Sequence, residues 1–143
     1  MRKLIVQYPN KILRTETVNL DLYSTPISVH KRNFNQLLYA SRIANGIGVA
    51  APQIGICQSF FLFGKKIAVN PKITWRSEDT EEMLEGCLSL ATNHFVERNK
   101  EIEVEYLNKD LVQIVERLSG LEARIFQHEY DHLMGKLILD YDK

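Results

Sequence analysis

The chain has few cysteines and no long apolar run. Its two cysteines, Cys57 and Cys87, are too few to staple a domain of 143 residues, so we expect free thiols in a reducing compartment, with a disulfide between them as the alternative. No stretch approaches the roughly 18 apolar residues of a membrane span, and the N-terminal MRKLIVQYPNKIL lacks the apolar core of a signal peptide. The sequence therefore predicts a cytoplasmic protein with no membrane partner.

An excess of charge of either sign is also missing. The 18 basic residues balance the 18 acidic ones, and no run of lysine or arginine forms a stripe, so no nucleic acid is expected as a partner. Hydrophobic residues make up 45% of the chain, which is typical of a globular protein. We expect residues 1–143 to form a single domain, because this length suffices for one sizeable core.

The segment SGLEARIFQHEYDHL, residues 119–133, has the clearest helical pattern. Ser119 followed three residues later by Glu122 is a capping-box sequence, so we expect the helix to begin there and to end near Gly135. Apolar residues then recur at helical spacing, at Leu121, Ile125, Phe126 and Leu133. The pattern predicts a helix with one buried face.

Two histidines four residues apart on this helix form an H-E-x-x-H motif. Residues at i and i+4 share a helix face, with Cβ atoms about 6 Å apart, so His128 and His132 can bind one divalent ion. Glu129 lies beside that ion and can accept a proton from an activated water without being a ligand. The alternative is two ordinary helix histidines with a surface glutamate.

Two histidines leave such an ion short of a protein ligand. Cys87 is the one unassigned soft ligand in a glycine-containing turn, EGCLS, so it would complete a three-ligand catalytic site with water fourth. Cys57 is the competitor, but it lies in an apolar, strand-like run and is better explained as a small buried residue.

A glycine-rich segment, GIGVAAPQIG, covers residues 46–55. It matches neither the phosphate-loop nor the dinucleotide-binding pattern, so a nucleotide is not expected. Its composition is typical of backbone held tightly in place, and a buried turn is the simplest interpretation. Gln53 is its only polar side chain, which either satisfies nearby backbone groups or points its amide N–H into a site to stabilise an oxyanion.

The remaining patterns predict one further helix and several strands. The helix runs from Pro26 or Ser28 to Ala44, with Ser24, Thr25 or Ser28 as candidate caps. Two hairpins are expected, from residues 56–63 with 67–69 and from residues 102–107 with 111–117. Asn70-Pro71 should end the first hairpin, residues 72–75 should form a separate strand, and residues 78–82 should be a solvated acidic loop. The prediction is an α+β fold of small antiparallel sheets wrapped around the metal-binding helix.

Three of these stretches, GIGVAAPQIG, EGCLS and QHEYDH, resemble in order and spacing the signature motifs of peptide deformylases. These metal hydrolases remove the formyl group from the N-terminal methionine of new proteins. The resemblance spans most of the chain and implies the deformylase fold in a short form without a C-terminal extension. It implies iron(II) on Cys87, His128 and His132, for which zinc, nickel or cobalt can substitute.

The resemblance also implies roles in catalysis and binding. Glu129 would be the acid and base, and Gln53 with the Leu88 backbone N–H would be the oxyanion donors. A sheet edge near Gly48 would pair with the substrate backbone. The pocket for the methionine side chain would be apolar, from Ile47, Met83, Leu121 and Ile125.

Asp131 lies one helical turn from His128, and Arg98 follows the second motif, so we expect these two to pair and to steady the metal-binding helix. Two positions depart from the family pattern: Ala91 stands where many relatives carry proline, and Arg124 occupies an often apolar helix position. The chain stops eleven residues after His132, so ribosome contact is not carried over. We expect a monomer acting on N-formylmethionyl nascent peptides.

Two other classes of protein remain open. A zinc peptidase of the H-E-x-x-H type would use the same helix, but normally takes its third ligand from beyond that helix. A non-catalytic metal-binding module would keep the ligands without needing Gln53 or Glu129.

Overall fold

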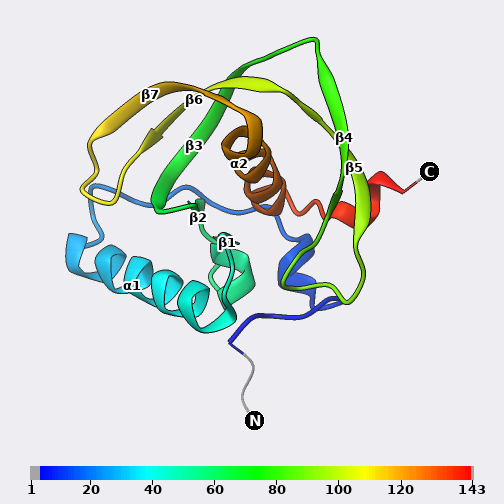
Figure 1. The fold of residues 1–143 in the computed structure, drawn as a ribbon. Coiled ribbons are helices and arrows are strands. Elements are labelled where there is room, and N and C mark those ends of the chain that lie inside the picture. Colours follow the sequence, from blue (N-terminus) through cyan, green and yellow to red (C-terminus); the bar gives the residue numbers. More distant parts are fainter. Residues whose placement is uncertain (1–3, 143) are drawn as a thin grey trace.

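The computed structural model describes residues 4–142 and places helix α2 (Gly120–Leu133) at the centre of an arc of strands (Figure 1). A five-stranded antiparallel sheet has the order β1-β2-β3-β6-β7, and β4 pairs with β5 in a separate two-stranded sheet. The predicted α+β fold, with small antiparallel sheets around the helix, is confirmed. The strands are β1 (Gly48–Ala50), β2 (Phe60–Phe63), β3 (Lys66–Arg76), β4 (Thr80–Glu85), β5 (His94–Asn99), β6 (Glu101–Leu107) and β7 (Gln113–Ser119).

Helix α2 is held by aromatic packing on its inner face. Phe126 is fully buried and meets the rings of Phe61 and Phe63 edge-on, at centroid distances of 4.9 and 5.0 Å. Ser119 is the N-cap residue, but its side chain makes no capping hydrogen bond. The Glu122 carboxylate pairs with a lysine instead, with Oε2 3.2 Å from Lys66 Nζ. The predicted helix is therefore present, while the predicted capping box is wrong.

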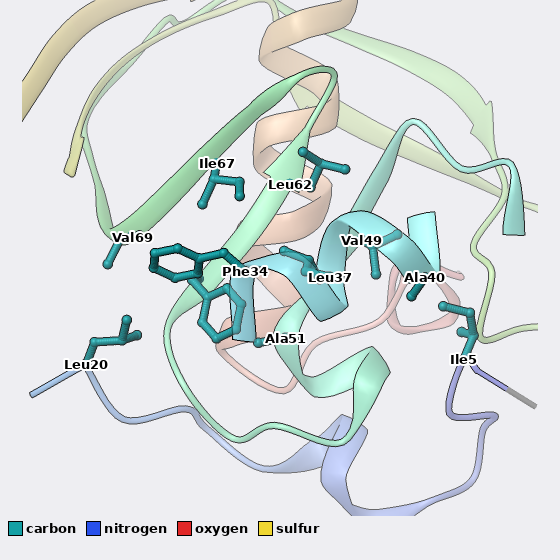
Figure 2. Close-up of a cluster of buried hydrophobic side chains, with 11 residues drawn as sticks. Ile5, Leu20, Phe34, Leu37, Ala40, Val49, Ala51, Leu62, Ile67 and Val69 are labelled. Atoms are coloured by element: carbon teal, nitrogen blue, oxygen red, sulfur yellow. The ribbon is translucent and has the colours of Figure 1, made fainter. Parts of the chain in front are cut away.

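Helix α1 (Ile27–Ala44) covers the other core (Figure 2). Phe34 packs edge-on against Phe60 of β2 at 5.3 Å, and the cluster continues to Val49 of β1. Asn45 adopts the left-handed conformation that ends the helix. Pro26 occupies the N-cap position without a side-chain cap, so the capping predicted for the neighbouring serines and threonine is wrong.

Three strand predictions need correction. Strand β3 runs through Asn70-Pro71 to Arg76, because a register shift between Val69 and Lys72 takes the proline out of the hydrogen-bond ladder. Of the predicted acidic loop, residues 78–79 precede β4 and residues 80–82 belong to it; the first five residues of β4 are exposed, although they pair with β5 as a strand. The first hairpin begins at Phe60 rather than at residue 56, and β5 was not predicted.

The N-terminal segment ties the motif-bearing loops together. Val6 N–H donates to the carbonyl of Gln53 at 2.7 Å, and Tyr8 N–H donates to that of Ser89 at 3.0 Å. The Gln7 amide donates to the Leu88 carbonyl at 3.0 Å. Residues 6–8 therefore hold the glycine-rich segment and the cysteine turn next to each other. Across residues 4–142, no helix is both long enough and apolar enough to cross a membrane.

Candidate metal centre

Three donor atoms converge between α2 and the turn after β4. The ligand atoms of Cys87, His128 and His132 all lie within 4.8 Å of one another. Cys87 Sγ is 3.4 Å from His132 Nε2, and both cysteines are free thiols. Cys57 is remote from this cluster and contacts the Glu16 carbonyl instead, at 3.6 Å. One thiol and two imidazoles form a donor set suited to a borderline or soft divalent metal.

A buried carboxylate, Glu85, orients one of the histidines. Its Oε1 lies 2.9 Å from His128 Nδ1, which leaves Nε2 as the nitrogen with a free lone pair. Arg98 donates two hydrogen bonds to the same carboxylate, from Nε and Nη2, each at 2.9 Å. Arg124 donates a further hydrogen bond to it from Nη1. Burial alone would raise the pKa of Glu85, but His128 and Arg98 hold it at about 2. Glu85 is therefore ionised at neutral pH.

The sequence analysis did not include Glu85 among the site residues. The sequence does offer one indication that Glu85 belongs to the site: it stands two residues before the proposed ligand Cys87. Its partner His128 is 43 residues away in the chain, so the contact depends on how β4 folds against α2.

The structure brings Arg98 and Asp131 together. Arg98 Nη1 donates to Asp131 Oδ2 at 2.7 Å, and the Tyr141 hydroxyl donates to the same oxygen at 2.5 Å. The Arg98 side chain is only 3% exposed. One arginine therefore links the carboxylate behind His128 to a second carboxylate on α2.

Glu129 lies beside the donor cluster without a firm partner. It is 3% exposed, its Oε1 has no hydrogen-bond partner within residues 4–142, and its Oε2 is 3.9 Å from His128 Nε2. Burial favours the neutral form and raises the pKa of Glu129 to about 7. A carboxylate with such a pKa can both accept and return a proton near neutral pH.

The charges around the histidines fit a cation. Burial lowers the pKa of His128, but Glu129, Cys87 and Glu85 outweigh burial and raise it to about 10, so this imidazole faces an excess of negative charge. Burial, with His128 nearby, lowers the pKa of His132 well below its ordinary value, which leaves that imidazole neutral. A divalent ion supplies the positive charge that these groups favour, so the residues present fit a metal.

Gln53 satisfies a backbone group and faces the cluster at the same time. Its Oε1 accepts from Ala50 N–H at 2.9 Å, which fixes the amide. Its Nε2 donates to Ser89 Oγ at 3.0 Å and lies 3.7 Å from Cys87 Sγ. The bond to Ala50 N–H confirms that Gln53 satisfies a nearby backbone group, while its role as an oxyanion donor stays a prediction.

A pocket of about 450 Å³ opens beside these groups. Leu88 and Gln53 line it near the donor cluster, together with His128 and Glu129. Glu85 and Arg124 are among the lining residues that the sequence analysis did not assign to the site. All five residues predicted to contact substrate are on its wall: Ile47, Gly48, Met83, Leu121 and Ile125.

Comparison with known proteins gives one family throughout. Residues 2–143 match the family model of polypeptide deformylase. A peptide deformylase of Pseudothermotoga lettingae is 39% identical over 98% of this chain and 82% of its own length. The crystal structure of a probable peptide deformylase from Synechococcus phage S-SSM7 superposes with a TM-score of 0.90 at 36% identity, covering 96% of this chain and 98% of the phage chain.

The peptide deformylase of Thermotoga maritima superposes with a TM-score of 0.89 at 34% identity, covering 100% of this chain and 99% of its own. Neither the zinc peptidase nor the non-catalytic module is favoured by these matches. The chain belongs to the peptide deformylase family, the hydrolases that remove the N-formyl group from newly made polypeptides.

Proposed function

We propose that the chain performs deformylation with iron(II) held by Cys87, His128 and His132. The observation that carries the proposal is the convergence of these three donors on the wall of an apolar pocket, beside a buried Glu129 whose Oε1 has no hydrogen-bond partner within residues 4–142. Such an ion would lower the pKa of a water molecule and draw electron density from the formyl oxygen. The proposed setting is the cytoplasm, with the protein acting as a monomer on N-formylmethionyl nascent peptides.

Glu129 is the residue proposed to move the proton. It accepts a proton from the attacking water, whose oxygen forms a bond to the formyl carbon. The carbon–nitrogen bond then breaks as Glu129 returns the proton to the departing amine, and the formic acid so released loses its remaining acidic proton to solvent as formate. Its position 3.9 Å from His128 Nε2, with one oxygen unpaired, leaves it available for both transfers.

Gln53 and Leu88 are the proposed oxyanion donors. The Gln53 amide is fixed through Ala50 N–H, and its Nε2 lies 3.7 Å from Cys87 Sγ, so exchanging that weak contact would bring an N–H to the negative charge that grows on the formyl oxygen. The Leu88 backbone is steadied through its carbonyl by Gln7. Each preorganised donor is typically worth about 3 kcal/mol of barrier.

The substrate is proposed to lie along the pocket with its first side chain among the apolar residues. Gly48 is at the edge of the five-stranded sheet, since β1 pairs with β2 on one side only within residues 4–142. An extended peptide can add to that edge by backbone hydrogen bonds, with its side chain in the pocket.

One assay separates the proposed function from the other two classes. Protein purified without air is assayed for formate release from a formyl-methionyl peptide and for cleavage of an internal peptide bond, and its metal content is measured. Formate release alone supports the proposal, internal cleavage indicates a peptidase, and bound metal without either activity indicates a binding module. Because iron(II) beside a thiol is open to oxygen chemistry, we expect activity to decay in air and to survive replacement by nickel or cobalt.

A further inference from the structure

Two cavities lie against the same three side chains. The pocket beside the donor cluster and a second cavity of about 310 Å³ share Met83, Leu121 and Arg124 as lining residues. The second cavity is otherwise lined by Glu81, residues 98–101 and residues 119–120, and by none of the metal-binding residues. The three shared side chains therefore form the wall between the two cavities.

Arg124 is the fixed part of this wall. Its Nη1 donates to the Glu85 carboxylate and, at 3.1 Å, to the Val96 carbonyl, while its Nη2 donates to the Glu81 carbonyl at 2.6 Å. These acceptors belong to β4 and β5, so one guanidinium locks α2 to both strands of the small sheet. Arg124 is 8% exposed, whereas Met83 and Leu121 are 42% and 62% exposed.

A buried guanidinium is an unusual wall for an apolar pocket. Removing an arginine from water is costly unless its donors are paired, and here they are paired with a carboxylate and two carbonyls. The bonds leave the side chain in one conformation, unlike that of a solvent-exposed arginine. It therefore cannot swing aside to admit a longer group without breaking three buried bonds.

We infer that Arg124 is a specificity-determining residue that sets the depth of the side-chain pocket, closing it toward the second cavity and so excluding first side chains longer than that of methionine. The inference rests on the proposed function, because it takes the pocket to hold the first side chain of a formyl peptide. Removing the Arg124 side chain joins the two cavities, and a longer unbranched side chain then gains space that the parent protein denies it.

The test compares two formyl peptides that differ only in the first residue. One begins with methionine and the other with 2-aminooctanoic acid, whose unbranched side chain is two atoms longer. We expect Arg124→Ala to lower the preference for methionine, as a ratio of kcat/KM values, by about 10-fold or more, since one or two methylenes in an apolar pocket carry that much discrimination. Arg124→Met replaces part of the lost volume but none of the hydrogen bonds, so the methionine can move aside and the ratio should fall by less than in Arg124→Ala.

A second variant keeps the inference testable if Arg124→Ala fails to fold. Met83 lies on the same wall, is exposed, and has no part in the bonds to Glu85, so Met83→Ala should shift the ratio in the same direction. Equal losses on both substrates in both variants, with the ratio unchanged, would show that the wall does not set pocket depth. A ratio that moves as far in Arg124→Met as in Arg124→Ala would overturn it as well.

The same ratio can be read without turnover. Calorimetric binding of the product peptides Met-Ala-Ser and 2-aminooctanoyl-Ala-Ser should show the same change of about 10-fold in relative Kd. If the parent releases no formate but the Kd ratio shifts in Arg124→Ala, the proposed function fails while the inference about pocket depth stands. If the parent protein releases formate but the Kd ratio is unchanged in Arg124→Ala, the proposed function stands and the inference about pocket depth fails.

Discussion

A Cβ atom built on Gly48 would lie 2.5 Å from Oε2 of Glu129 and 3.0 Å from Cγ2 of Ile125. The backbone of β1 thus passes so close to α2 that no side chain fits between them. Glu129 is 3% exposed and lines the pocket, so a side chain at position 48 would push its carboxylate away from its present place. The glycine-rich segment therefore serves the site by leaving space for the carboxylate.

Gly48→Ala should accordingly displace Glu129 while leaving the metal ligands in place. We expect kcat for a formyl-methionyl peptide to fall about 100-fold, because a misplacement of roughly 1 Å can cost that much. Metal content should match that of the parent protein. Full activity with parental metal content would show that the carboxylate tolerates the shift and that the close approach has no catalytic meaning.

The two cysteines offer a matched pair of variants. Cys87 Sγ is within reach of both histidines, whereas Cys57 contacts only the Glu16 carbonyl among its hydrogen-bond acceptors in residues 4–142. Cys87→Ser should lose the native metal or most of the activity, and Cys57→Ser should be nearly silent. Metal analysis and formate release on both proteins check this, and equal metal loss in the two would contradict the ligand assignment.

Arg98 joins Glu85 and Asp131 from a buried position, so its removal leaves Asp131 without its arginine and Glu85 with only Arg124 and His128. We expect Arg98→Ala to lower the free energy of unfolding by about 3–5 kcal/mol and to weaken metal affinity by about 10–100-fold. Arg117→Ala is the control, since its pair with Glu103 is exposed and worth at most about 1 kcal/mol. Urea unfolding and metal titration on both variants test this, and similar behaviour of the two would remove the supporting role of Arg98.

The features predictable from the sequence were those carried by local patterns. The helix bearing His128 and His132 follows from apolar residues at helical spacing, and the hairpin of β6 and β7 follows from two β-rich runs around a short turn. The three-motif order brought in Gln53 and Cys87. Each of these features could be predicted without knowing which distant segments contact one another.

The features that were missed depend on contacts between distant segments. Strand β4 is exposed at five of its six positions, so it lacks the alternation that marks a strand, and its pairing with β5 alone makes it one. Glu85 acquires its role only when β4 meets α2, and Arg124 acquires its bonds from the same packing. Such roles follow from tertiary structure rather than from spacing.

A surface ion pair links the two ends of the described chain. Arg14 of the short helix Lys11–Arg14 donates to Asp140 at 2.5 and 2.9 Å, and this bond to Arg14 lowers the pKa of Asp140 from its ordinary value of 3.8. A lowered carboxyl pKa contributes stability above pH ~4, which is lost as the pH falls through the folded-state pKa.

Asp140→Asn should therefore reduce the free energy of unfolding by about 0.2–1 kcal/mol at pH 7, because the pair is partly exposed. The difference between variant and parent should shrink toward zero as the pH falls from 5 to about 2. Chemical unfolding at several pH values measures it. A difference that grows on acidification would mean that the pair does not stabilise the ionised form of Asp140.

Glu129→Gln divides an enzyme from a metal-binding module most sharply. The substitution keeps the shape of the side chain against Gly48 but removes the proton acceptor, and Glu129 is outside the donor cluster of Cys87, His128 and His132. The ion should stay bound, and a formyl-methionyl peptide should bind about as well as to the parent. General-base help is typically worth 10²–10⁴-fold, so turnover should fall at least ~100-fold. Metal titration, peptide binding and formate release on one preparation measure all three quantities. Near-parental turnover with the metal retained would show that another group handles the proton, and the role proposed for Glu129 would have to be abandoned.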